Sequence, residues 1–375
     1  MAIAVTPNLL RDLATFRAGN RCALSLYLDL DPSVTPTTPD VEAKFRARLN
    51  EAAKHAEEHA GERDCRTAVR EDIERIEAWW DNDFDRDGVR GLALFASGAD
   101  GYFLALPLST SVADATCIGE ELLLSPLIGR FSEVDTLVAV VSREQGRIYR
   151  LRNDRLEEIV DESEEQPGQH DQGGWSQARY QRHIDHLVQQ HLKSVGAALQ
   201  RKARVSRQLQ LVVVCPEEMR SNFTSALTQE ARDSVVGWAS AEAHATASEL
   251  LEIVRPLLDE AEARRQQDAL ARFAEGIGRG ERAVAGWQAT LDAAADTRVD
   301  MLLLTEGATQ TLYQCPECRR GYVEDGTCPI DDLALVASED GDDIAVRHVL
   351  ANGGSVTRVG AGALGDAPIG ALLRF

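Results

Sequence analysis

"VDTLVAVVSREQGRIYRLRNDRLEEI", residues 134–159, decides how the middle of this 375-residue chain folds. Its apolar residues alternate with polar ones on both sides of a turn near Gln145 and Gly146, a pattern that predicts a β-hairpin. A polar loop, a basic helix, a buried-type strand at Leu209 to Cys215 and another helix follow. This alternation predicts a mixed α/β sheet.

The flanking parts of the chain show similar patterns. "ALSLYLDLD", residues 23–31, alternates as a half-buried strand does; the following prolines end it. Residues 42–80 read as a helical hairpin broken near Gly61, and residues 91–108 read as two strands. These features predict a small α/β domain before the central hairpin.

The last part of the chain has strand and helix patterns of its own. A helix is expected at Ala283 to Ala294, a strand at Val299 to Glu306, a helix at Ile344 to Asn352 and a closing strand in "IGALLRF". A helical pattern from about Ala241 to Phe273 leads into them. We therefore expect three domains in a mixed α/β (α+β) chain, at residues 1–132, 133–275 and 276–375.

The composition indicates a cytoplasmic globular protein. The sequence contains no apolar run long enough to cross a bilayer, and residues 1–7 lack the pattern of a signal peptide. The formal net charge is −21, which argues against a nucleic-acid partner unless the charges are segregated.

The charges are segregated in one segment. Residues 173–210 contain seven Lys or Arg residues and a single acid, Asp185, a local balance of +6. The basic residues are Arg179, Arg182, Lys193, Arg201, Lys202, Arg204 and Arg207. An ordinary solvated helix face is the alternative to a polyanion-binding patch.

The basic segment begins with a polar, glycine-containing loop, "HDQGGWSQARYQRHIDHL", residues 170–187. We expect a helix to start just after Ser176, a favourable N-cap, so that the preceding glycines lie at the positive end of its dipole. Backbone amides there could stabilise an anion, although a flexible glycine turn is the alternative. The apolar stripe expected to face the core comprises Tyr180, Ile184, Leu187, Val188, Leu192, Val195 and Leu199.

This loop and helix resemble the catalytic region of eukaryotic and archaeal class I peptide-chain release factors, where a Gly-Gly-Gln loop leads into an arginine-rich helix. Here Trp175 and Ser176 separate Gly174 from Gln177. This spacing is closer to that of the ribosome quality-control peptidyl-tRNA hydrolases and of their bacterial release-factor-like relatives.

The resemblance extends beyond the loop. Residues 134–159 resemble the opening hairpin of the release factors' RNase H-like central domain. Residues 282–307 resemble the start of their third domain, and residues 365–375 its closing strand. No Asn-Ile-Lys-Ser tetrapeptide occurs in residues 41–80, so rescue of stalled ribosomes or of large subunits is expected rather than stop-codon reading.

The resemblance implies hydrolysis of the peptidyl-tRNA ester in the peptidyl-transferase centre of the large ribosomal subunit. Gln177 would present its backbone N–H to the developing tetrahedral centre and shape the water pocket, and Gly173 and Gly174 would allow close approach. Arg179, Arg182, Lys193, Arg201, Lys202 and Arg204 would contact RNA phosphates.

The implied partners are the ribosome, peptidyl-tRNA and a translational GTPase, with no membrane, no organic cofactor and a monomeric chain. The alternative function is occupation of the ribosomal A site without hydrolysis, as in Pelota-like or hibernation-type factors. Histidines near the loop, His170, His183 and His186, are expected to contact solvent or phosphate rather than act as bases.

A second motif is the cysteine cluster in "YQCPECRRGYVEDGTCPIDD". The spacing of Cys315, Cys318 and Cys328 is typical of a zinc ribbon at about residues 313–334, with Asp331 in the place of a fourth cysteine. His348 as fourth ligand, a redox pair and loss of the metal are the alternatives. The remaining cysteines, Cys22, Cys65, Cys117 and Cys215, are expected to be reduced core thiols.

Overall fold

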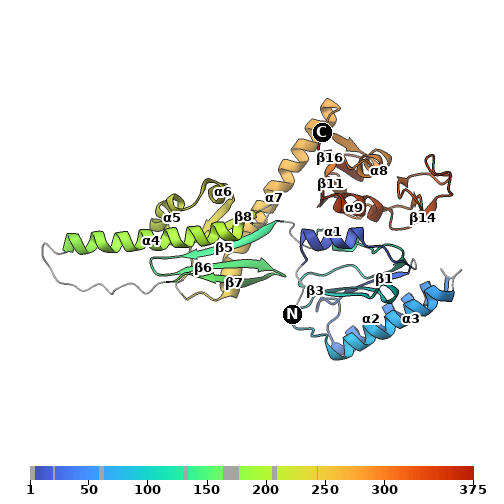
Figure 1. Cartoon of the computed structure of the whole chain (residues 1–375), viewed down its shortest axis with the longest axis horizontal. Helices are drawn as coiled ribbons and strands as arrows, with labels where there is room; N and C mark the ends of the chain where they lie inside the picture. Colours follow the sequence, from blue (N-terminus) through green and yellow to red (C-terminus); the bar gives the residue numbers. More distant parts are fainter. Residues whose placement is uncertain are drawn as a thin grey trace. The chain divides into compact units, whose positions relative to one another are not determined.

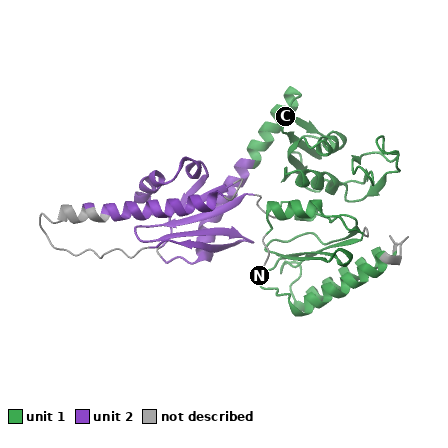
Figure 2. Ribbon diagram, viewed as in Figure 1, with its two compact units in different colours: residues 1–131, 266–375 green, residues 132–265 purple. Residues whose placement is uncertain are grey.

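The computed structural model describes residues 5–19, 22–58, 63–129, 134–163, 177–204, 209–242 and 244–375. The chain divides into two compact units (Figure 2): one combines residues 1–131 with residues 266–375, and the other comprises residues 132–265. Sheets and helices occur in both units, which confirms the predicted mixed α/β fold.

The N-terminal sheet of the first unit is antiparallel, in the order β3-β2-β1-β4. Along β1 the side chains alternate between two buried faces, because Leu24, Leu26 and Leu28 belong to one apolar cluster and Tyr27 to another. Two helices cover the leucine face (Figure 1). The elements are β1 (Ala23–Asp29), α2 (Thr38–Glu58), α3 (Arg63–Asn82), β2 (Gly91–Ser97), β3 (Tyr102–Leu108) and β4 (Ala115–Gly119).

The C-terminal part of this unit contains a sheet in the order β10-β16-β11-β15 and a small three-stranded sheet, β13-β12-β14. The closing segment "IGALLRF" forms strand β16, as the sequence predicted, and β16 is one of the two inner strands of the four-stranded sheet. The elements are β10 (Ala283–Ala285), α8 (Trp287–Ala295), β11 (Val299–Thr305), β12 (Leu312–Gln314), β13 (Gly321–Tyr322), β14 (Val336–Ser338), α9 (Gly341–Ala351), β15 (Ser355–Val359) and β16 (Ile369–Leu373).

The N-terminal and C-terminal parts share one hydrophobic core. The cluster around Tyr27 and Phe95 also contains Leu291, Ile344 and Leu302 from the C-terminal part, together with residues of α1 (Pro7–Thr15). The sequence predicted separate domains at residues 1–132 and 276–375, each with its own elements. In the structure, apolar side chains of each part are buried against those of the other.

The second unit contains a five-stranded sheet, β7-β6-β5-β8-β9. The predicted hairpin forms between β5 and β6, and residues 155–161 extend it as a third antiparallel strand. β8 and β9 are added in parallel to β5. The strands are β5 (Asp135–Val141), β6 (Gly146–Arg152), β7 (Arg155–Asp161), β8 (Leu209–Val214) and β9 (Val235–Ala239).

Helices cover both faces of this sheet. α4 (Gln177–Ala203), α5 (Arg220–Ala226) and α6 (Gln229–Asp233) contribute to the core on one face, and the first turns of α7 (Ala247–Arg279) to the core on the other. α7 begins and ends about six residues later than the pattern predicted at Ala241 to Phe273, and it passes from residues of the second unit to residues of the first.

One prediction about the cysteines is wrong. Cys22, directly before β1, forms a disulfide with Cys65 of α3, with their Cα atoms 5.6 Å apart. These cysteines are 43 residues apart, and the packing of α3 over β1 brings them together. Cys117 and Cys215 are free thiols, as predicted. Among the described residues, no helix combines the length and the apolar character required to cross a membrane.

Candidate functional site

α4 begins at Gln177, which confirms the predicted helix start after Ser176. Leu192, Val195 and Leu199 are fully buried, whereas Leu187 and Val188 are only half-buried. The N-terminal part of the helix extends past the sheet (Figure 1). The second half of the predicted apolar stripe, from Leu192 to Leu199, therefore belongs to the hydrophobic core. The side chains of Tyr180 and Ile184 lie outside the described residues.

The buried half of α4 packs against the β5–β6 turn. His191 is fully buried, and its Nε2 lies 3.1 Å from the Gln145 carbonyl oxygen. The Gly146 amide donates to Ser163 Oγ, and the Glu162 amide donates to the Gly146 carbonyl. The role of His191 was not predicted, because nothing in the local sequence pattern distinguishes a buried histidine on this helix from a solvated one.

The strand end that enters the predicted loop is fixed to the middle of α4. Glu162 Oε2 accepts a hydrogen bond from Ser194 Oγ at 3.0 Å, and Glu162 Oε1 lies 3.4 Å from an Nη of Arg201. Gln177 is 17 residues before Ser194, about 26 Å along an α-helix. The end of β7 is therefore held beside Ser194, whereas α4 begins at Gln177, about 26 Å away along the helix axis.

Basic side chains form a stripe along the outer side of α4, here called the basic stripe and defined as Arg182 and Lys193 of the helix and Arg204 directly after it. All three are exposed. They recur every 11 residues, which advances about 16 Å and returns to almost the same angle on a helix. Arg201 is exposed and ion-paired with Glu162, while Lys202 is half-buried.

The other predicted residues of this site are at the start of α4 or precede it in the sequence. Gly173 and Gly174 lie outside the described residues, as does the side chain of Arg179. Gln177 is described as the first residue of α4, without its side chain. What the structure establishes is the support: a helix whose first residue is Gln177 and whose outer face carries the basic stripe.

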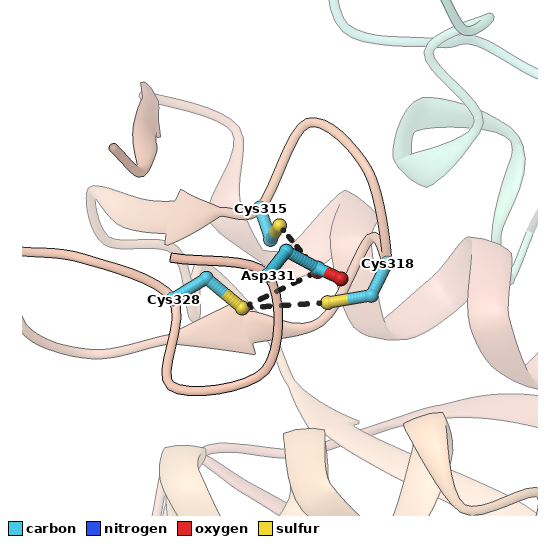
Figure 3. Close-up of side chains that lie close together, drawn as sticks. All are labelled: Cys315, Cys318, Cys328 and Asp331. Carbon is cyan, nitrogen blue, oxygen red and sulfur yellow. Dashed lines mark hydrogen bonds between the residues drawn. The ribbon is translucent and has the colours of Figure 1, made fainter. Parts of the chain in front are cut away.

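The four predicted metal ligands lie together (Figure 3). One possible ligand atom from each of Cys315, Cys318, Cys328 and Asp331 lies within 4.8 Å of the others. Cys315 Sγ lies 3.1 Å from Asp331 Oδ2, and Cys318 Sγ lies 3.5 Å from Cys328 Sγ. A tetrahedral zinc site with bonds of about 2.3 Å has edges of roughly 3.8 Å. These residues therefore fit a tetrahedral metal ion of the zinc type.

The ligands are supplied by two turns with the same backbone pattern. In the first turn, the Arg319 amide donates to the Cys315 carbonyl at 3.1 Å. In the second, the Asp332 amide donates to the Cys328 carbonyl at 3.0 Å. Arg319 and Asp332 both have left-handed backbones, with φ of 64° and 54°. Asp331 thus occupies the position that Cys318 occupies in the first turn.

The surroundings favour the set with Asp331 over the alternative with His348. His348 Nε2 lies 2.8 Å from the Arg319 carbonyl oxygen, and burial lowers the pKa of His348.

Burial raises the pKa of the Cys318 thiol to about 12. A cation at the cluster would have to displace this proton, since the thiolate is the metal-binding form.

Next to the cluster lies a buried charge network that sequence analysis missed. Arg319 Nη2 lies 2.9 Å from Glu121 Oε1, and Arg319 Nη1 lies 3.5 Å from Glu120 Oε2. The Arg319 side chain is only 10% exposed. Arg319 and Glu121 are 198 residues apart, so no local pattern could have paired them.

Comparison with known proteins finds similarity to peptide-chain release factors. Residues 130–256 match the family model "Bacterial archaeo-eukaryotic release factor family 10". Peptide chain release factor subunit 1 of Methanopyrus kandleri is 26% identical over 207 residues, which cover 53% of this chain and 50% of the relative. The chain thus matches about half the length of that relative. The predicted resemblance to the release-factor group is confirmed.

Two solved structures show weaker similarity. Dom34 of Saccharomyces cerevisiae is 14% identical, with 78% of this chain and 81% of that chain covered and a TM-score of 0.42. Pelota of Archaeoglobus fulgidus is 15% identical, with 76% of this chain and 79% of that chain covered and a TM-score of 0.32.

Proposed function

We propose that this chain, whose central segment is release-factor-like, acts on the ribosome and hydrolyses the ester that joins a nascent peptide to tRNA. The observation that carries the proposal is the match of residues 130–256 to the release-factor family model. That segment contains the Gly-Gly-x-x-Gln motif and all of α4. Stalled ribosomes, or large subunits that still carry peptidyl-tRNA, are the proposed substrates.

The proposed chemistry requires no covalent intermediate on the protein. Water attacks the ester carbonyl, and the backbone N–H of Gln177 donates to the oxygen on which negative charge develops. The Gln177 side chain shapes the pocket that admits the water, and Gly173 and Gly174 let the backbone approach the ester closely. The peptidyl-transferase centre supplies the remaining groups.

The basic stripe supports binding to RNA despite the net charge of −21. Three exposed cations on the outer side of α4 favour contact with phosphates, and Arg179, Arg201 and Lys202 are proposed to extend that contact. Because such contacts release counterions, the affinity for ribosomal particles should fall steeply as salt is raised.

Peptide release tests the proposal. Stalled ribosomes and isolated large subunits charged with labelled peptidyl-tRNA are incubated with wild type, Gln177→Ala or Gln190→Ala, the last replacing an exposed glutamine of the same helix. Wild type and Gln190→Ala should release peptide. Gln177→Ala keeps the backbone N–H and removes only the side chain that shapes the water pocket, so it should bind equally and release at least about 100-fold less, a usual cost of losing a positioning group.

The second candidate function is occupation of the A site without hydrolysis. Trp175 and Ser176, which separate Gly174 from Gln177, favour this candidate, because they change the spacing found in the class I release factors that the loop resembles. Equal binding by all three proteins with no release by any of them would select it.

A further inference from the structure

We propose that a metal ion at Cys315, Cys318, Cys328 and Asp331 controls how firmly the N-terminal sheet is held to the C-terminal part of the same unit. The connecting residue is Arg319, which directly follows the ligand Cys318. This inference concerns the first compact unit alone and is independent of any activity on the ribosome.

Arg319 joins the cluster to the N-terminal part through its side chain. The guanidinium contacts Glu121 Oε1 with Nε at 3.1 Å and with Nη2 at 2.9 Å, and it contacts Glu120 Oε2 with Nη1 at 3.5 Å. Glu120 and Glu121 directly follow β4. A displacement of Arg319 would leave Glu121, whose side chain is 11% exposed, without this partner.

The network continues from Glu121 to backbone amides of the N-terminal part. Glu121 Oε2 is ion-paired with Arg347, and Arg347 Nε lies 3.0 Å from Asp343 Oδ2. Asp343 Oδ1 accepts hydrogen bonds from the amides of Leu124 and Ser125, each at 2.7 Å. The hydrogen bonds of the Leu124 and Ser125 amides therefore depend on a series of side-chain contacts that begins at Arg319, next to the metal ligands.

The metal ligands Cys315 and Cys318 lie in the turn whose backbone conformation sets the direction of the Arg319 side chain. Arg319 has φ of +64°, a strained region for a non-glycine residue, and its amide is bonded to the Cys315 carbonyl. A cation shared by Cys315 and Cys318 fixes the ends of this turn. Without a cation, three thiols and one carboxylate have no common centre, and the turn loses the constraint that opposes its relaxation.

Amide hydrogen exchange of the full chain tests the inference. Exchange at Leu124 and Ser125 is measured in protein loaded with Zn²⁺ and after removal of the metal with a chelator, with metal content determined on the same samples. We expect exchange at both amides to become at least about tenfold faster after removal, since loss of a local contact lowers the free energy of local opening. Amides of Leu211 and Val212 in β8, in the other unit, should not change.

Variants separate this coupling from general instability. Arg319→Gln should keep one Zn²⁺ per chain but show fast exchange at Leu124 and Ser125 with or without metal. Arg320→Gln removes an ion pair with Asp296, which follows α8 in the C-terminal part, and should respond to metal as wild type does. The proposal is overturned if the chain takes up no Zn²⁺, if the two amides ignore metal removal, or if Arg319→Gln keeps metal-dependent protection.

Discussion

Gly146, the first residue of β6, lies directly against Val195 of α4. A β-carbon built on Gly146 would stand 2.4 Å from a methyl group of Val195 and 3.0 Å from Cε1 of His191. The β5–β6 turn and the helix that begins at Gln177 therefore fit together only when this position has no side chain. The position of α4 on its sheet depends on this contact.

Gly146→Ala is expected to destabilise the second unit by about 1–3 kcal/mol, because the added methyl group forces α4 away from the turn. Chemical denaturation monitored by circular dichroism would measure the loss. Gly278→Ala is the matched control, since a β-carbon there meets nothing within 4 Å. Equal stability of wild type and Gly146→Ala would mean that α4 shifts without cost.

Reversal of charge in the basic stripe should weaken ribosome binding. Lys193→Glu and Arg204→Glu are expected to reduce co-sedimentation with ribosomal particles. In each variant, the binding constant should fall less steeply with salt, and the slope of its logarithm against log salt should be smaller in magnitude by about one. Arg46→Glu, an equal charge change on α2, should have little effect. Binding that is unchanged in both stripe variants would argue against RNA contact by the outer face of α4.

Replacement of the oxygen ligand should tighten zinc binding. In Asp331→Cys, the second turn would have the same Cys-Pro-x-Cys pattern as the first as well as the same backbone, giving four thiolates. We expect a zinc affinity at least about tenfold higher in competition with a chromophoric chelator. Asp325→Cys adds an exposed cysteine outside the cluster and should leave the affinity unchanged.

Asp72 should give the first unit a specific pH dependence. Asp72 is 1% exposed, and burial raises its pKa to about 6 from a usual value near 3.8. The folded state therefore binds this proton more tightly than the unfolded state, and Asp72 costs stability as pH rises from about 4 to about 6. Asp72→Asn removes this titration.

The expected result is a pH-dependent difference in the free energy of unfolding. Relative to wild type, Asp72→Asn should gain about 2 to 3 kcal/mol between pH 4 and pH 6 and no more above pH 7. Thermal denaturation across this range would measure it. The exposed Asp81→Asn, also on α3, should show no such gain. A difference that does not change with pH would contradict the assignment to Asp72.

Features set by neighbouring residues were predictable from sequence. The β5–β6 hairpin follows from alternation, the start of α4 from the serine that the sequence predicts as its N-cap, and the metal cluster from cysteine spacing. The missed features depend on residues far apart in the chain. The Cys22–Cys65 disulfide and the Arg319–Glu121 pair arise only after helices and sheets have packed, and a sequence pattern contains no record of that packing.

The division of the chain has a consequence for its own synthesis. Residues 132–265 contain the complete sheet of the second unit and emerge from the ribosome before residues 266–375 exist. The N-terminal sheet is translated before the second unit, but the Tyr27 side of its core includes Leu291 and Ile344, which are translated after the second unit. Because domains generally fold as they are synthesised, the N-terminal sheet completes its core only after residues 266–375 have been translated, whereas the second unit can fold before them.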